Sequence, residues 1–397
     1  MASQVVSGLV SVAEELSGAR ILLVAQFGRT GGTRTYFEQL LRFYMERKAD
    51  LVVAVDGPDA ADDLLAQLVV QGIPYWNLAD RVGTGSMGTI DRLSGGVSRA
   101  RFGRELRTFR TVVDQEGIDL VVASVGHPGL LLGAVSAAPR GIYLLHTYPH
   151  GLRSSLLHPV KRYMLSRKTS FVTVSDFAAK VTARAWRMGD GSVARLYSTA
   201  GPVILTEETA HPLTPSVVTL GHVEPYKDPL TWIAVAEEVL REKPDVRFRW
   251  FGEGSQLDRC RGIVETRGLA GRVDFPGAIG DVDSVLSHAT VYLQPSRVES
   301  LGLAVLDAAR RGLPCVVSRV GGLPEVVADR QTGLIAAAGD VSGFAGAVGS
   351  LLADSGLAGR LGQAAKTRYQ DTFTPEAWAG GLMDLHVRAM EDEPAER

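Results

Sequence analysis

The chain of 397 residues lacks the features that mark several classes of protein. Its only cysteines are Cys260 and Cys315, which excludes a disulfide framework and a zinc site built on cysteines. No charge of one sign predominates, because 42 Lys and Arg residues stand against 44 Asp and Glu residues. A strongly basic nucleic-acid-binding protein and an acidic disordered tail are therefore both poor interpretations, and no nucleic acid is expected as a partner.

Long apolar segments are also missing. The longest apolar run, residues 129–138, is about half of the roughly 18 residues that a membrane span needs. Near the N-terminus, Glu14 and Glu15 interrupt a short apolar stretch that no basic segment precedes, so no signal peptide is expected. These features together predict a cytoplasmic protein.

The sequence is rich instead in short β-branched runs that alternate with longer segments of helical period. Examples are residues 20–27, 50–55, 141–146, 216–221 and 313–318. Continuous apolar strands of this kind are buried on both faces, which indicates parallel sheets covered by helices. The alternation predicts an α/β protein with doubly wound sheets.

A break in this pattern divides the chain. Residues 199–215 carry three prolines and little helical period, which is typical of a linker. We therefore expect one Rossmann-like domain at 1–200 and a second at 214–372, facing each other across a cleft in which a ligand binds. A last helix at 375–397, with Thr374 as N-cap and Pro375 at its first position, is expected to return to the first domain.

Three segments have features of binding sites. In the first, Gly31 and Gly32 follow a strand and precede a helix expected to begin near Thr35. Backbone N–H groups without a Cβ in their way suit a phosphate at a helix N-terminus. The spacing is not G-x-G-x-x-G, so a tight turn between strand and helix is an equally good interpretation.

In the second segment, Lys227 stands just before a predicted helix that follows the 216–221 strand and Gly221. A lysine there opposes the helix dipole unless an anion binds nearby. Taken alone, a solvated surface lysine is the simpler interpretation.

The third segment, residues 295–327, is the most informative. Glu299 lies in a turn after a strand, Gly302 permits close backbone approach, and Asp307 lies in a short helix that Gly312 terminates. At 3.6 residues per turn, a separation of eight residues places the two carboxylates on similar faces. Two acids on one side of a strand–turn–helix suit the hydroxyl groups of a sugar and a ribose.

In this order and spacing, these segments resemble retaining glycosyltransferases of the two-Rossmann-domain (GT-B) type, and specifically glycosyltransferase family 4. Glu299 and Asp307 stand where the family has a Glu-x7-Glu pair. Gly221-His222 and Lys227-Asp228 stand where it has Gly-Arg followed by Lys-Gly. The flanking FGEGSQ, DFPGAI, SLGLAVLDA and GGLPEVV also match, and the resemblance is strong from about residue 217 to 340 and faint before that.

The resemblance implies a donor site. Lys227 would bind the donor diphosphate and take part in catalysis. Glu299 would lie beside the sugar hydroxyls as a catalytic residue, and Asp307 would hold the ribose. The other donor-binding residues that it implies are Gly31 and Gly32 at the diphosphate, His222, Ala278 and Ile279 near the base, and the backbone N–H groups of Leu301, Gly302, Leu303 and Ala304.

The resemblance places the acceptor on the N-terminal domain. His146 would stand at the donor sugar as a catalytic residue, although a histidine satisfied at a strand end is an alternative. His127, Tyr148 and His150, with the Gly/Ser-rich loop at 81–99, are expected to bind the acceptor.

Two residues depart from the family pattern. His222 replaces the usual arginine, which removes a permanent bidentate phosphate ligand. Asp307 is one methylene shorter than glutamate. Either change is compatible with an altered donor preference.

The expected activity is transfer of a sugar, with retention, from a nucleotide-diphosphate sugar to a hydroxyl of a small-molecule, natural-product or envelope-precursor acceptor, and UDP is favoured over GDP. No cofactor or metal is expected, because no Asp-x-Asp pair ends a strand and Asp281 and Asp283 fit a helix N-terminus. The alternatives are an epimerase or hydrolase of the same fold and a non-catalytic nucleotide-sugar-binding protein.

Basic residues gather in two predicted helices, near residues 99–110 and 158–168. Some relatives dock on anionic membranes through such helices. Here the arginines are interspersed with Glu105 and few large apolar residues, which favours a solvated face over peripheral membrane contact. The sequence does not indicate an oligomeric state.

Overall fold

The computed structural model describes residues 16, 18–26, 32–56, 62–77, 99–126, 132–149, 169–200 and 214–391. The chain forms two compact units. The first comprises Met1–Leu196 with Ala379–Arg397, and the second comprises Tyr197–Trp378. Both have the α/β class that the alternating pattern predicts.

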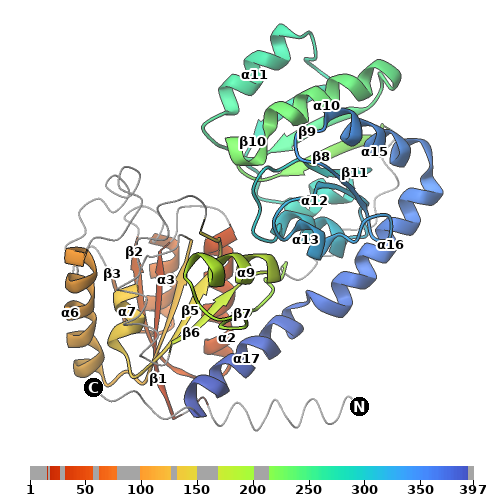
Figure 1. Ribbon diagram of the computed structural model, residues 1–397. Helices are drawn as coiled ribbons and strands as arrows, with labels where there is room; N and C mark the ends of the chain where they lie inside the picture. Colours follow the sequence, from red (N-terminus) through yellow and green to blue (C-terminus); the bar gives the residue numbers. More distant parts are fainter. Residues whose placement is uncertain are drawn as a thin grey trace. The chain divides into compact units, whose positions relative to one another are not determined.

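The first unit is built on a parallel sheet (Figure 1). Among the described residues, seven strands pair in the order β3-β2-β1-β4-β5-β6-β7. Their bounds are β1 Arg20–Gln26, β2 Asp50–Asp56, β3 Tyr75–Asn77, β4 Leu120–Val125, β5 Arg140–Leu145, β6 Thr169–Thr173 and β7 Val193–Arg195. The helices that cover it are α2 Gly32–Glu46, α3 Asp62–Val70, α6 Arg99–Glu116, α7 Leu132–Ala137, α9 Asp176–Ala185 and the end of α17 Pro375–Glu391.

Helices cover both faces of this sheet, which is why its central strands are apolar throughout. Every residue of β4 is buried. Leu22 and Val24 of β1 pack into the same core cluster as Phe109 of α6. On the opposite face, Tyr44 of α2 lies against His386 of α17, with ring centroids 5.9 Å apart.

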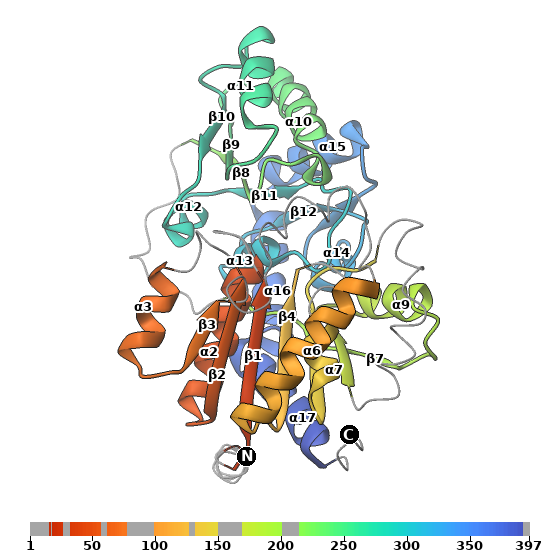
Figure 2. The same ribbon diagram turned by 90° about the vertical axis from the view of Figure 1, so that its left-hand side faces the viewer.

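The second unit repeats the plan (Figure 2). Six described strands, all parallel, pair in the order β10-β9-β8-β11-β12-β13. Their bounds are β8 Ser216–Leu220, β9 Arg247–Phe251, β10 Val273–Gly277, β11 Val291–Gln294, β12 Cys315–Ser318 and β13 Leu334–Ala336. The helices are α10 Pro229–Glu242, α11 Leu257–Thr266, α12 Val282–Ser287, α13 Leu303–Arg310, α14 Leu323–Val326, α15 Val341–Ala353, α16 Ser355–Thr372 and the start of α17.

Aromatic side chains fill the core between this sheet and the helices α10, α11 and α15. Trp232 of α10 is fully buried and makes edge contacts with Phe248, Trp250 and Phe275 of the sheet. Burial of rings this large contributes several kcal/mol to stability, so the second unit has a substantial core of its own.

The strand orders locate the expected ligand sites. The order reverses between β1 and β4 in the first sheet and between β8 and β11 in the second. In open α/β sheets, ligands bind outside the carboxyl ends of the strands at such reversals. The loops after β8 and β11 therefore lie where a ligand of the second unit is expected.

Helix ends follow the expected caps in part. The Thr374 hydroxyl accepts from the Ala377 N–H at 3.2 Å, and the Asp281 carboxylate accepts from the Ser284 N–H at 2.9 Å. The helix expected near Thr35 begins earlier, at Gly32. Glycine is a poor helix former, so the sequence pattern placed that boundary too late.

Within the described residues, no single helix is long and apolar enough to cross a membrane. A pair of helical segments, Val341–Ala353 with Ser355–Glu391, meets the length and composition criteria only when taken together, and it is bent by 104°.

Burial of His386 predicts a pH-dependent stability. The side chain is 2% exposed, neither ring nitrogen has a hydrogen-bond partner among the described residues, and burial lowers its pKa to about 4. In the unfolded chain the histidine binds a proton near pH 6.5, whereas in the folded protein it does so only near pH 4. The free energy of unfolding therefore decreases as pH falls from 6.5 toward 4, by about 3 kcal/mol near pH 4. In urea titrations across this range, His386→Leu should show a shallower pH dependence than the wild type.

The exposed His288 supplies the matched control, since His288→Leu removes a histidine that the fold does not bury. An equally steep loss of stability toward pH 4 in His386→Leu would show that His386 does not contribute to it.

Candidate functional site

Lys227 and Glu299 meet at the strand-order reversal of the second sheet. Lys227 ends a short 3₁₀ turn, Pro225–Lys227, in the loop after β8, and Glu299 lies in the loop after β11. The Lys227 Nζ is 2.5 Å from the Glu299 Oε2, and each side chain is 14% exposed. The structure thus brings together two of the predicted site residues, and it shows that Lys227 is not a solvated surface lysine.

Two buried side chains hold the Glu299 carboxylate by hydrogen bonds to its Oε2. The Gln294 Nε2 donates to the Glu299 Oε2 at 2.6 Å, and the Ser296 hydroxyl approaches the same oxygen at 3.4 Å. The Gln294 Oε1 in turn accepts from the Tyr292 hydroxyl at 2.9 Å. Burial raises the pKa of Tyr292 well above its usual value, so its hydroxyl stays protonated and donates. Sequence analysis missed Gln294, which looks like an ordinary strand residue.

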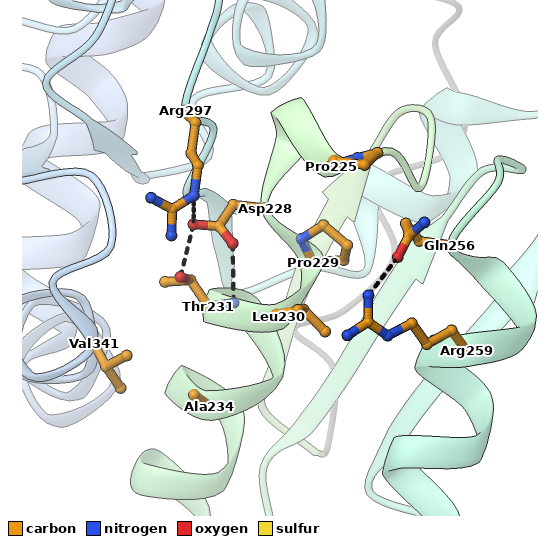
Figure 3. A pocket seen from close by; sticks show the side chains of 10 residues that line it. All are labelled: Pro225, Asp228, Pro229, Leu230, Thr231, Ala234, Gln256, Arg259, Arg297 and Val341. Carbon is orange, nitrogen blue, oxygen red and sulfur yellow. Dashed lines mark hydrogen bonds and ion pairs between the residues drawn. The ribbon is translucent and has the colours of Figure 1, made fainter.

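The two loops are joined by backbone hydrogen bonds and by a second ion pair. Figure 3 shows the ion pair, which Arg297 forms with Asp228. The N–H groups of Arg297 and Val298 both donate to the carbonyl of Tyr226, at 2.8 and 3.2 Å. The Arg297 Nε is 2.8 Å from the Asp228 Oδ2. Asp228 adopts a left-handed conformation and caps α10 by accepting from the Thr231 N–H at 3.3 Å. Asp228 thus links the β11 loop to the helix.

A third loop, between β12 and α14, contacts the backbone of Glu299. The Gly322 N–H donates to the Glu299 carbonyl at 3.2 Å. At Gly321, where φ is +55°, a Cβ would overlap that same carbonyl oxygen. Only glycine permits this approach together with the left-handed backbone. The GGLPEVV segment therefore has a packing role at the site.

The N-terminus of α13 follows directly after the loop that carries Glu299. Gly302 is the N-cap, with φ of +105°, and its carbonyl accepts from the N–H groups of Val305 and Leu306. The N–H groups of Leu303 and Ala304 lie in the first turn, where an α-helix offers no internal acceptor. Leu301 is buried just before the helix. These amides suit an anion, as expected for a donor phosphate.

The position of Asp307 relative to Glu299 differs from the one that helical spacing predicts. Glu299 lies in a turn and Asp307 lies in α13, so helical spacing does not relate the two carboxylates and that part of the sequence argument is wrong. The Asp307 Oδ1 accepts from the Arg310 Nε at 3.1 Å. Burial raises the pKa of Asp307, and the Arg310 guanidinium opposes that rise. Asp283 lies in the first turn of α12, as expected for a residue that complements the helix dipole, and it is also buried beside Arg310.

The remaining donor candidates of the second unit follow the carboxyl ends of β8 and β10. His222 is half-buried two residues after β8. Ala278 is exposed and Ile279 is half-buried, directly after β10. Their positions are compatible with the implied contacts to phosphate and base, which stay predictions.

Figure 3 shows the side chains that line a hollow of about 550 Å³ in the second unit. Neither Lys227 nor Glu299 lines it, whereas Asp228 and Arg297 do. The other residues that line it are Pro225, Pro229, Leu230, Thr231, Ala234, Gln256, Arg259 and Val341.

In the first unit, His146 follows β5 and is held as a neutral side chain. Its Nε2 is 2.8 Å from the Ser124 hydroxyl, and its ring lies 4.3 Å from that of Tyr36. Burial lowers its pKa to about 3, so the imidazole carries no charge at neutral pH. His146 can therefore donate or accept a hydrogen bond but cannot serve as a cation.

Of the other first-unit candidates, Gly32 is the first residue of α2 and is exposed. Tyr148 is 8% exposed and makes an edge contact with Phe177, an exposed ring at the start of α9 that sequence analysis missed. Gly31, His127 and His150 lie outside the described residues, as do the loop at 81–98 and the basic segment at 158–168.

No three His, Cys, Asp or Glu side chains gather within the described residues in a way that suits a metal ion. The expectation of metal-independent chemistry stays a prediction.

Residues 207–368 match the family Glycosyl transferases group 1. The chain contains a glycosyl transferases group 1 domain. All residues of the Lys227–Glu299 site and of α13 fall inside that domain.

Curated relatives match about half to two thirds of the chain. A glycogen synthase of Mycobacterium tuberculosis is 31% identical over 180 residues, which is 44% of this chain and 42% of the relative. A GDP-mannose-dependent α-(1-6)-phosphatidylinositol monomannoside mannosyltransferase of Mycolicibacterium smegmatis is 28% identical over 281 residues, 65% of this chain and 73% of the relative. The matched part thus spans less than half the length of the glycogen synthase.

Solved structures extend the likeness in fold to nearly the whole chain. Anabaena HepE, solved in complex with UDP and glucose, superposes with a TM-score of 0.73 at 16% identity, covering 93% of this chain and 99% of the other. The first and second units of the chain thus have the GT-B fold, as the sequence predicts.

Gly321→Ala tests the packing of the group 1 domain around Glu299. The added Cβ overlaps the Glu299 carbonyl and the left-handed backbone disfavours any L residue, so we expect the free energy of unfolding to fall by about 2 kcal/mol or more. Gly346→Ala in α15 is the control, because its Cβ would meet no atom within 4 Å and alanine favours a helix. Urea denaturation measures both, and a Gly321→Ala protein as stable as the wild type would contradict the tight contact.

Proposed function

We propose that the protein is a retaining glycosyltransferase of the cytoplasm that transfers a sugar from a nucleotide-diphosphate sugar to an acceptor hydroxyl. The observation that carries the proposal is the Lys227–Glu299 pair, which lies at the strand-order reversal of a glycosyl transferases group 1 domain. The N–H groups at the start of α13 follow it in the same loop.

Lys227 is proposed to stabilise the negative charge that develops on the departing diphosphate. Glu299 neutralises the Lys227 ammonium in this structure, so a donor diphosphate would take over part of that role. The α13 amides of Leu303 and Ala304 would add fixed dipoles that need little rearrangement. His222, Gly31 and Gly32 are proposed to lie near the same phosphates.

Glu299 is proposed to orient the donor sugar and to stabilise oxocarbenium-like positive charge at its anomeric carbon. Its hydrogen bonds from Gln294 and Ser296 fix the carboxylate, which suits electrostatic stabilisation better than covalent attack. Asp307 is proposed to bind the ribose, and Ala278 or Ile279 to lie beside the base.

The first unit is proposed to supply the acceptor site through His127, Tyr148 and His150. His146, neutral because of its burial, is proposed to hydrogen-bond a hydroxyl of the donor sugar. The proton of the acceptor hydroxyl would pass to the leaving phosphate oxygen on the same face of the sugar. A small molecule, a natural product or an envelope precursor would serve as acceptor.

UDP is the proposed nucleotide. Support comes from the structure of HepE, which was solved in complex with UDP and glucose. The mannosyltransferase relative is named for GDP-mannose, so GDP is the competing choice.

Lys227→Ala should slow sugar transfer about 30- to 1,000-fold, because a charge-assisted contact that strengthens as the diphosphate departs is worth about 2–4 kcal/mol. Steady-state kinetics with saturating donor measure this loss. Lys180→Ala, which removes an exposed lysine of α9, is the matched control and should leave the rate unchanged. A normal rate in Lys227→Ala would remove Lys227 from the mechanism.

Turnover of α-linked UDP-sugars with a panel of acceptors tests the reaction as a whole. We expect an α-linked product, identified by the coupling of its anomeric proton in NMR spectra, and activity that survives EDTA. Lysine and backbone dipoles serve the diphosphate in this mechanism, so it needs no divalent cation.

Other outcomes separate the alternatives. A β-linked product would contradict retention, and an absolute need for Mg²⁺ or Mn²⁺ would contradict the proposed electrostatics. Release of free sugar without transfer would indicate a hydrolase, and nucleotide binding without turnover would indicate a non-catalytic binding protein.

A further inference from the structure

Arg310 is a buried arginine that bridges two carboxylates of the second unit. It lies on α13 one turn beyond Asp307 and is 5% exposed. Its Nε donates to the Asp307 Oδ1 at 3.1 Å, and its Nη2 is 2.8 Å from the Asp283 Oδ1. Asp283 belongs to α12, so the guanidinium fixes Asp307 relative to a second helix.

Stability alone does not account for this arrangement. The Arg310 Nη1 is buried without a hydrogen-bond partner among the described residues. A buried ion pair gains little over apolar packing of the same volume, and an unpartnered buried N–H group costs free energy. Groups whose pKa is shifted by burial and by a charged partner, as that of Asp307 is, concentrate at functional sites.

The Asp307 carboxylate has the features of a ligand-binding group, because the protein engages only one of its two oxygens. Its Oδ1 is occupied by Arg310, whereas its Oδ2 accepts no hydrogen bond from the described residues. The side chain is 24% exposed, although the arginine that holds it is buried. One oxygen is thus fixed by the protein and the other is left for a ligand.

We propose that Arg310 is a positioning residue that aims the Asp307 carboxylate at the ribose of the bound nucleotide. The inference rests on the proposed function. Asp307 is shorter than the glutamate of the resemblance, so its reach depends on where its single methylene is held. Arg310 holds it through Nε, and Asp283 anchors Arg310.

Arg311 provides an internal comparison. Its Nε is 2.7 Å from the same Asp283 Oδ1, and its charge lowers the pKa of Asp307 less than that of Arg310 does. Changing Arg311 disturbs Asp283 without releasing Asp307 directly. A role limited to stability would affect Arg310 and Arg311 variants alike.

The test measures ribose discrimination, which is the ratio of dissociation constants for a 2′-deoxynucleotide and its ribonucleotide. A thermal-shift screen of UDP, GDP and ADP first selects the nucleotide, and calorimetry then compares it with its 2′-deoxy form. One hydrogen bond to a charged group predicts a ratio of about tenfold or more in the wild-type protein.

Arg310→Met should bring this ratio close to one, and Arg310→Lys, which keeps the charge without the planar fork, should give an intermediate value. Arg311→Met should keep the wild-type ratio. In an Asp307→Ala background, where the ratio is already near one, Arg310→Met should change it no further. If Arg310→Met fails to fold, a reduced ratio in Arg310→Lys decides the question.

The contrary outcomes are distinct. A wild-type ratio in the Arg310 variants, or an equal fall in Arg311→Met, would overturn the positioning role and leave the proposed function standing. Equal binding of both forms by the wild-type protein would overturn the ribose role of Asp307 and this inference with it. Binding of none of the three nucleotides by the wild-type protein would overturn the proposed function itself.

Discussion

Lys227 and Glu299 form their ion pair where the strand order of the second sheet reverses, and the neighbouring loops are fastened around it. The β8 loop brings the ammonium, the β11 loop brings the carboxylate, and Gly321 closes against the backbone of Glu299. At 14% exposure the pair is screened less than a surface ion pair would be. Removing either partner would leave a charge that its surroundings solvate poorly, so the loops and the pair depend on each other.

The same pair sets the electrostatics for the proposed donor. An ammonium already neutralised by a carboxylate attracts a diphosphate less than a bare one would, and the diphosphate would have to replace that carboxylate as counter-ion. Glu299 can yield this role because Gln294 and Ser296 also hold its Oε2. In the proposed reaction the carboxylate would then face the sugar while Lys227 faces the phosphates.

The sequence predicted the parallel sheets, the loops that carry Lys227 and Glu299, and the caps at Asp281 and Thr374, because these depend on local patterns. It missed what depends on distant contacts. Gln294 lies in an apolar strand, and its bond to Glu299 exists only because the β11 loop turns back. Helical spacing misplaced Glu299 relative to Asp307, since α13 begins four residues after Glu299. In the sequence, Arg310 is one of two adjacent arginines of the kind usually found on a surface. Its burial depends on the carboxylate of Asp283, which a different helix, α12, supplies.

The proposed proton transfer follows from what the fold does to its candidate bases. Burial lowers the pKa of His146 to about 3, which makes the imidazole a weak base at neutral pH. The Oε2 of Glu299 already accepts from the Lys227 ammonium and the Gln294 amide, so it is engaged before an acceptor hydroxyl could approach it. Neither side chain is thus matched to removing a proton from a hydroxyl. The departing phosphate oxygen gains negative charge as the glycosidic bond breaks, so in the proposed reaction it is the group whose basicity rises when the acceptor must lose its proton.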